Sequence, residues 1–322
     1  MVKKIINWWY RRRTKNLTQI PLFVVHFNYR IYKKLNVTMK KYVFEVNKEF
    51  DGHKIKDFLK REIGLSEVVI KTVKYGHVLV NGEFVDMRKI VKLGDKISVT
   101  LPPDPPNDWL KPKDVPLEVL YEDDYLLAVF KPSGMPCHNS WGLEETTLQE
   151  VVTHYSLPEN ITFRAVNRLD KDTAGIVIIA KDHISASFLG KLMASGDFVK
   201  HYHAVVSGVP EKKHDIIDLP IKRIIPSRVK RGVLDGGKRA ITEYFVEKEL
   251  DDNKSLLKVI LHTGRTHQIR VHLSHIGHPL YADELYGKRV EGKTYSLTAY
   301  YLEFTHPFTK ERIKLNYKGK SL

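Results

Sequence analysis

The sequence predicts an α+β protein with two domains, a small one of helices and short strands and a larger one with a central, mostly antiparallel sheet. The chain has 322 residues, whereas one hydrophobic core usually organises about 100 to 200 residues. A proline-rich segment divides it, since residues 102–116 hold six of the 15 prolines. Beyond that segment, strand patterns outnumber helical patterns, which favours the α+β class.

The composition is that of an ordinary soluble globular protein, with 42% hydrophobic and 28% charged residues. No run approaches the ~18 apolar residues that a membrane-spanning helix requires, so we expect no membrane partner. The single cysteine, Cys137, can form neither an intramolecular disulfide nor a cysteine-rich zinc site, which points to the cytoplasm. The net charge of +15 predicts a polyanionic partner, because lysines and arginines that neutralise phosphates release condensed counterions.

Residues 1–38 carry nine of the basic residues and no acid, which leaves a net charge of only +6 for residues 39–322. Their side chains follow neither strand nor helix periodicity, so we do not expect a domain there. The serine- and alanine-rich pattern of a transit peptide is missing, and a basic RNA-gripping arm is an alternative. We expect Met39 to be the natural start, with residues 1–38 disordered or the product of a start assigned too far upstream.

Residues 39–101 are predicted to form the small domain. The expected elements are a strand at 40–47, helices at 53–63 and 66–74, a strand that enters the turn Asn81-Gly82, and a strand at 96–101. The strands alternate polar and apolar side chains, and the helices space apolar side chains every three or four residues. Asn-Gly is the strongest short signal for a hairpin.

The stretch from Asp51 to Val99 resembles the α-L RNA-binding module found in a small-subunit ribosomal protein and in many RNA-modifying enzymes. The resemblance rests on Lys71-Thr-Val-Lys-Tyr-Gly-His-Val-Leu-Val-Asn-Gly82 and Leu93-Gly-Asp-Lys-Ile-Ser-Val99. It implies a basic helical face that meets RNA phosphates. The residues that can supply this face are Lys54, Lys56, Lys60, Arg61, Lys71 and Lys74. By charge alone, a solvated helix surface would look the same.

Residues 102–116 are predicted to be an extended linker, because proline blocks both helices and central strands. Residues 117–322 are predicted to be the larger domain. Its expected strands are 117–121, 125–130, 175–180, 202–207, 239–250 and 255–262, and its expected helices are 147–155, 184–195 and 266–276. Thr263 or Thr266 is expected to cap the last helix.

The segment Arg168-Leu-Asp-Lys-Asp-Thr-Ala-Gly175 places two carboxylates in a turn before an apolar strand. Taken alone, Asp170 and Asp172 fit hydrogen bonding to turn amides, as aspartate commonly does. They could also be metal ligands or a glycosidase pair. However, side chains two apart in a tight turn rarely reach the ~5 to 9 Å carboxyl separation that glycoside hydrolysis needs.

From Asn167 to Gly175 the chain resembles the signature of the RluA/RluD family of pseudouridine synthases, His-Arg-Leu-Asp-x-x-Thr-(Ser/Ala/Thr)-Gly. Only the first position differs, where Asn167 replaces histidine. A second block, from His262 to Asp283, matches the family's other signature. Its five histidines include no His-Glu-x-x-His, so we expect no metal site. Two further blocks complete the resemblance, which extends from about Asp51 to the C-terminus: Phe130-Lys-Pro-Ser-Gly-Met-Pro136 and Lys200-His-Tyr-His-Ala-Val-Val-Ser-Gly208.

The resemblance implies a pseudouridine synthase catalytic domain at residues 117–322 that isomerises uridine in RNA to pseudouridine. It implies that Asp170 is the nucleophile, that Tyr202 stands over the base, and that Arg270 is the counter-ion of the carboxylate. Arg168 is the candidate to fill the gap that a flipped uridine leaves in the RNA. The further substrate-binding residues that we expect are Leu273, Arg265, His267 and Lys131. Breaking C1′–N1 and forming C1′–C5 needs no net redox change, so no cofactor is expected.

The expected partner is RNA, and the α-L module favours large-subunit ribosomal RNA over tRNA by analogy. We infer no obligate protein partner and expect a monomer. One alternative is a catalytically silent RNA-binding protein that assists ribosome assembly, although Asp170, Tyr202 and Arg270 are all retained. Another is a metal-dependent nuclease that uses Asp170 and Asp172, which would lose activity with a chelator.

Overall fold

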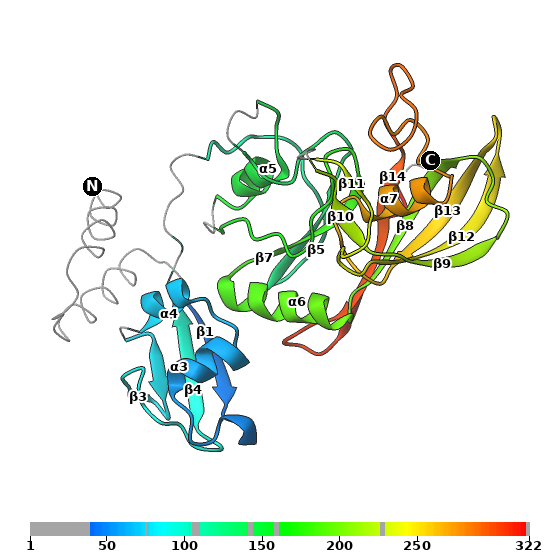
Figure 1. Ribbon diagram of the computed structural model, residues 1–322. Coiled ribbons are helices and arrows are strands. Elements are labelled where there is room, and N and C mark those ends of the chain that lie inside the picture. The colour runs from blue at the N-terminus through cyan, green and yellow to red at the C-terminus, as the bar shows by residue number, and fades with distance from the viewer. Residues whose placement is uncertain are drawn as a thin grey trace. The chain divides into compact units, whose positions relative to one another are not determined.

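The computed structural model describes residues 39–319, except 75, 103, 105–109, 141–143, 158–160 and 226–228 (Figure 1). The chain divides into two compact units, with the boundary between Pro103 and Asp104. This boundary falls inside the predicted linker. The expectations for residues 1–38 concern a segment outside the described residues. No helix in the described ranges combines the length and the apolar composition that crossing a membrane would require.

The first unit is a four-stranded antiparallel sheet with short helices. Its elements are β1 (Lys40–Glu45), η1 (Lys48–Phe50), α3 (Ile55–Asp57), η2 (Phe58–Glu62), α4 (Glu67–Val73), β2 (Val78–Val80), β3 (Glu83–Phe84) and β4 (Lys96–Leu101). The strand order is β1-β4-β2-β3. Asn81 and Gly82 both adopt positive φ, 51° and 87°, as a tight hairpin turn between β2 and β3 requires.

The basic face predicted for this unit is partly engaged by acids. Lys56 and Lys60 lie 3.1 and 3.3 Å from the two carboxylate oxygens of Glu67. Arg61 lies 3.2 Å from Glu49. Exposed ion pairs of this kind contribute only about 0–1 kcal/mol each, so phosphates could displace them. The RNA-binding role of this face stays a prediction.

The second unit contains the large sheet, with helices packed against it (Figure 1). Its strands are β5 (Glu118–Glu122), β6 (Leu126–Lys131), β7 (Ala174–Ala180), β8 (Val199–Ser207), β9 (His214–Asp218), β12 (Ile241–Leu250), β13 (Lys254–Leu261), β14 (Leu297–Thr305) and β15 (Arg312–Asn316). Its helices are α5 (Leu148–Tyr155), α6 (His183–Ser195) and α7 (Gln268–His275). The strand order is β5-β6-β7-β14-β8-β13-β12-β9, and β15 pairs with β14. Among the strands of the described residues, only β7 and β14 pair in parallel, which confirms the mostly antiparallel sheet.

Each strand and helix predicted for this unit is present within a few residues of its expected bounds. The strands β9, β14 and β15 were not predicted. A separate hairpin of β10 (Ile221–Arg223) and β11 (Arg231–Val233) was also missed. The described residues of the predicted linker contact this unit, since Leu110 is buried and the amide of Lys113 donates to the carbonyl of Glu150 at 3.3 Å.

The sheet separates two hydrophobic cores. Leu127, Val129, Val177 and Ile179 face one core, and their neighbours in β6 and β7 face the other, where Leu189 of α6 packs. Strands that are buried on both faces read as continuous apolar runs, as β7 does. The turn before β7 is therefore attached to the most buried part of the sheet.

Gly175 is required where β7 meets β14. Its φ is 130°, and a Cβ atom would lie 2.4 Å from the carbonyl oxygen of Ala299, its partner in the parallel pair. We expect Gly175→Ala to lower the free energy of unfolding by about 2–4 kcal/mol, measured by urea denaturation, because both the dihedral angle and the contact are strained.

Gly190, in the interior of α6, is the matched control. A Cβ atom there would meet no atom within 4 Å, so Gly190→Ala should raise stability by about 0.5–1 kcal/mol. Equal stability of the two variants would contradict this account of Gly175.

Candidate active site

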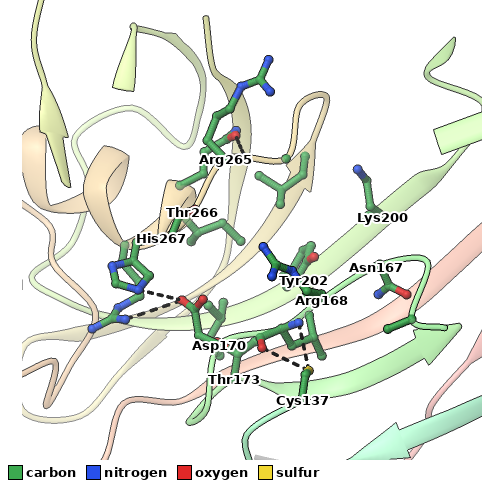
Figure 2. Close-up of a pocket in the computed structure, with 18 of the residues that line it drawn as sticks. Cys137, Asn167, Arg168, Asp170, Thr173, Lys200, Tyr202, Arg265, Thr266 and His267 are labelled. Atoms are coloured by element: carbon green, nitrogen blue, oxygen red, sulfur yellow. Dashed lines mark hydrogen bonds and ion pairs between the residues drawn. The ribbon is translucent and has the colours of Figure 1, made fainter. Parts of the chain in front are cut away.

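A cavity of about 560 Å³ lies in the second unit (Figure 2). Its lining comes mainly from residues 136–138, 165–171, Thr173, Lys200, Tyr202 and 264–270, so all four sequence blocks of the resemblance meet here. Among the described residues that line it, Asp170 is the one acid. The lining cations are Arg168, Lys171, Lys200, Arg265 and Arg270. The cations of such a cavity suit a polyanionic ligand. Its one acid can then meet a reacting group of that ligand.

The turn that carries Asp170 is held by one backbone hydrogen bond and by side chains on either side of it. The thiol of Cys137 lies 3.4 Å from the amide nitrogen of Leu169 and 3.3 Å from its carbonyl oxygen. The amide of Thr173 donates to the carbonyl of Asp170 at 3.1 Å. The hydroxyl of Thr173 meets that of Tyr295 at 3.4 Å. These contacts fix the backbone on both sides of Asp170 and leave its carboxylate available to the cavity.

Asn167, which replaces the histidine of the family signature, ties the approach to this turn to β7. Its Nδ2 donates to the carbonyl of Ile176 at 2.9 Å, and its Oδ1 accepts from the amide of Ile178 at 2.8 Å. The amide of Val166 donates to the carbonyl of Ile178 at 2.7 Å and continues the same pairing. One side-chain amide thus satisfies both a donor and an acceptor of the strand, and the turn is anchored without an imidazole.

Arg270 is anchored by an acid that the sequence reasoning did not assign. Its Nε and Nη2 donate to the two carboxylate oxygens of Asp283 at 2.7 and 2.8 Å, and Asp283 is fully buried. The guanidinium lies over the rings of Tyr295 and Tyr286, 4.5 and 5.0 Å from their centroids. Burial alone would lower the pKa of Arg270, but the bonds to Asp283 outweigh it and the pKa is raised. Arg270 is a permanent cation.

A third nitrogen of the Arg270 guanidinium faces Asp170. Its Nη1 lies 3.5 Å from Oδ2 of Asp170. The expectation that Arg270 is the counter-ion of this carboxylate therefore agrees with the geometry, although Asp283 is its closer partner.

His267 is the second group beside the carboxylate. Its Nε2 lies 3.8 Å from Oδ2 of Asp170, and its Nδ1 lies 2.9 Å from the hydroxyl of Tyr286 (Figure 2). Burial lowers the pKa of His267, and Arg270 acts in the same direction against the opposing charge of Asp170. The imidazole is therefore neutral at neutral pH, and the pair with Asp170 is not an ion pair there.

The helix that carries Arg270 begins without the expected threonine cap. The residue before α7 is His267, whose φ is 58°, and no side chain caps the helix. The hydroxyl of Thr263 accepts from the amide of Ile241 at 2.8 Å and donates to Gln268 at 2.8 Å. The predicted cap by Thr263 or Thr266 is wrong, because Gln268 fixes the preceding loop instead.

Tyr202 lies on β8, lines the cavity and is nearly buried. Burial and the nearby charge of Asp170 raise the pKa of its phenol. The hydroxyl therefore keeps its proton through the neutral range. A flat, protonated ring in this position can pack against a base and donate a hydrogen bond.

Two residues expected to bind substrate lie elsewhere. Lys131 is fully buried, and its ammonium donates to the carbonyls of Pro132, Met135 and Lys171 at 2.9, 2.8 and 2.8 Å. Burial lowers the pKa of Lys131 to about 8. Its side chain cannot reach a substrate, and it instead ties two loops together beside Asp170. This corrects the substrate-binding prediction.

The prediction that Leu273 binds substrate is also wrong, because Leu273 is fully buried in the core and does not line the cavity. The apolar lining comes instead from residues that include Leu261, Ile269 and Leu297. Arg168 and Arg265 do line the cavity and are exposed. The Nε of Arg265 donates to the carbonyl of Arg239 at 2.9 Å.

The sequence contained one signal for the missed anchor. No acid stands between Asp252 and Asp283, so a buried Arg270 had few acids nearby in sequence with which to pair. Nothing in the sequence indicated that Tyr286 and Tyr295 lie next to Arg270, because their position depends on the path of the loop between α7 and β14. Within the described ranges, no three His, Cys, Asp or Glu side chains are grouped to hold a metal ion.

Known proteins share these segments. A family model described as RNA pseudouridylate synthase matches residues 125–275. YjbO of Bacillus subtilis, named as an RNA pseudouridine synthase, is 35% identical over 264 residues, which cover 79% of this chain and 92% of that protein. Ribosomal large subunit pseudouridine synthase D of Pseudomonas aeruginosa is 34% identical over 260 residues, which cover 75% of this chain and 80% of that protein.

A solved structure agrees with these matches. The structure of human RNA pseudouridylate synthase domain containing 1 is similar with a TM-score of 0.54 and 25% identity. The similarity covers 64% of this chain and 85% of that chain.

The Arg270–Asp283 pair can be tested through stability. Asp283→Asn keeps the side-chain shape but leaves a buried cation without its counter-ion, which costs about 3–5 kcal/mol. We expect the free energy of unfolding at pH 7, measured with urea, to fall by about that amount. Asp252→Asn removes a largely exposed carboxylate 3.0 Å from Lys254 and should cost less than about 1 kcal/mol. Equal losses in the two variants would argue against the anchor.

The neutral state of His267 predicts a pH dependence. A histidine whose pKa is lowered by folding adds stability above its unfolded pKa of about 6.5, and this stability is lost as pH falls. The unfolding free energy of the wild type should therefore fall more steeply between pH 7 and 5 than that of His267→Gln. The difference in slope is at most about 1.4 kcal/mol per pH unit, the value for one proton. A steeper fall in the variant would mean that His267 is protonated beside Asp170.

Proposed function

Since the chain belongs to the family of RNA pseudouridine synthases, we propose that it converts uridines of large-subunit ribosomal RNA to pseudouridine, with Asp170 as the nucleophile. The observation that carries the proposal is the single carboxylate in a cationic cavity, 3.5 Å from a permanently charged Arg270. The chemistry moves a base within one molecule, so it requires a nucleophile and proton transfer but no redox partner.

Asp170 suits attack at C1′ of the ribose. Arg270 supplies a positive charge 3.5 Å from its carboxylate. Because Asp283 and two aromatic rings hold Arg270, the charge stays in place when the nucleotide displaces water. Preorganised charges of this kind stabilise charge that develops during reaction without further rearrangement.

Tyr202 is proposed to pack on the uracil ring and to hydrogen-bond to it through its hydroxyl. The raised pKa of the phenol makes the phenolate costly at neutral pH, so Tyr202 acts here as a platform and a donor. If Tyr202 accepts a proton during the rearrangement, the neutral phenol must accept it on a lone pair of its oxygen. The neutral His267 beside Asp170 is a second group that could accept a proton.

The uridine must leave the RNA stack to reach Asp170, at a cost of a few kcal/mol. Arg168 is proposed to fill the gap that remains. Its side chain is exposed at the edge of the cavity, close in sequence to Asp170. A planar guanidinium can stack on bases and also pair with phosphate.

Large-subunit ribosomal RNA is proposed because a relative that shares most of this chain carries that substrate in its name. The first unit, with its resemblance to the α-L module, supports an RNA target that offers a second binding surface. We further propose that the protein acts as a monomer in the cytoplasm, a proposal supported by its single, buried cysteine. A catalytically silent role in ribosome assembly is disfavoured, since the nucleophile and its cation are both in place.

A complementation experiment tests the substrate and the nucleophile together. Pseudouridines in all cellular RNA are mapped in a strain that lacks the gene and in strains that express the wild type, Asp170→Asn or Asp172→Asn. We expect the wild type and Asp172→Asn to restore the same positions in large-subunit rRNA. Asp170→Asn should restore none, with tritium release from C5-labelled uridine at least about 10³-fold lower in vitro.

Asp172 is the matched control because it lies in the same turn but does not line the cavity. Restoration of the modification by Asp170→Asn would contradict the assignment of Asp170 as the nucleophile. Positions restored only in tRNA would overturn the proposed substrate and leave the nucleophile standing.

A further inference from the structure

Lys200 is a cation in the cavity that the proposed chemistry does not use. It lies near the start of β8, two residues before Tyr202, and the two side chains therefore leave the strand on the same face. In Figure 2, Tyr202 and Arg168 lie between Lys200 and Asp170. Lys200 thus marks a part of the cavity away from the nucleophile.

The surroundings of Lys200 are largely apolar. It pairs in register with Leu302 of β14, just beyond the irregularity between Ala299 and Tyr301. Phe198, which directly precedes β8, is buried in the hydrophobic core that also contains Leu189 of α6, and Met193 of α6 lines the cavity. Lys200 therefore stands where the sheet passes from one hydrophobic core to the other. Burial without a nearby acid lowers the pKa of its ammonium.

Lys200 differs from other cations of the cavity in its partners. Arg270 pairs with Asp283, Lys171 pairs with Glu145, and Arg265 donates to a carbonyl. For Lys200, no hydrogen bond or ion pair is found within the described ranges. A half-buried ammonium is poorly hydrated, so an anion that enters the cavity would recover the free energy lost by desolvation.

We propose that Lys200 binds a backbone phosphate of the RNA next to the flipped uridine, as a positioning residue for the reaction. This inference rests on the proposed RNA substrate. An ammonium is a compact point charge that suits a phosphate oxygen, whereas the planar Arg168 suits stacking. With C1′ of the ribose at Asp170 and the base against Tyr202, the strand must continue along the cavity, and Lys200 is the cation on that side. The phosphate fixes the ribose relative to the nucleophile.

The test compares Lys200→Met, which removes the charge and keeps the length, with Lys200→Arg, which keeps the charge. The control is Lys248→Met, because Lys248 is exposed on β12 and outside the cavity but carries the same charge. The substrate is total RNA from the strain that lacks the gene, labelled with tritium at uridine C5. The kcat/KM and kcat values are measured from about 0.05 to 0.3 M KCl.

We expect Lys200→Met to lower kcat/KM about tenfold near 0.1 M KCl, mainly through KM. Its plot of log kcat/KM against log [KCl] should be shallower by about 0.7 to 0.9, the loss of one phosphate contact. Lys200→Arg should keep the wild-type slope, and Lys248→Met should match the wild type in both quantities.

An unchanged slope in Lys200→Met would overturn the inference, as would a loss confined to kcat with a changed pH profile, which would make Lys200 a proton-transfer group. Filter binding of Asp170→Asn, with and without Lys200→Met, to the same RNA gives the slope without turnover. Absence of tritium release by the wild type would instead refute the proposed function. The binding slopes still decide the role of Lys200 in that case.

Discussion

The buried pair of Arg270 and Asp283 is the interaction on which the arrangement of the site depends. Two donors of the guanidinium are satisfied by a carboxylate that is itself excluded from water, and the guanidinium lies over two aromatic rings. Its Nη1 is directed toward Asp170, 3.5 Å from Oδ2. Arg270 is therefore a fixed charge whose position is set by the protein, and the carboxylate of Asp170 is placed against it. Desolvating such a pair is costly, so its value lies in geometry more than in net stability.

The turn that carries Asp170 is also fixed by buried polar contacts. Here side chains bind backbone groups, whereas Arg270 is held by a charged carboxylate. Asn167 joins the chain before Asp170 to β7, and Cys137 and Lys131 hold the peptide groups on either side of it. None of these side chains needs to touch a substrate. At position 167 the carboxamide offers both a donor and an acceptor to the strand, so this anchor does not require an imidazole.

The sequence predicted the elements whose side chains alternate or repeat because of burial, such as β7, β13 and α6. It failed for β14, where an irregularity between Ala299 and Tyr301 breaks the alternation, and for β9, a short strand with exposed polar side chains. The motifs identified Asp170, Tyr202, His267 and Arg270, which do meet in one cavity. Asp283 could have been inferred from the scarcity of acids near Arg270. The burial of Lys131 and Leu273 could not, because it results from packing between distant segments.

The place of β14 in the sheet has a consequence for how the protein matures. This late strand lies between β7, which follows the Asp170 turn, and β8, which carries Tyr202, and pairs with both. The two walls of the cavity are thus joined by residues 297–305, far along the chain from Asp170. During translation the earlier segments can emerge and collapse, but they cannot close the sheet until this strand has left the ribosome. A nascent chain that has not yet released residues 297–305 should therefore lack the closed sheet, and the cavity is completed only after this strand has emerged.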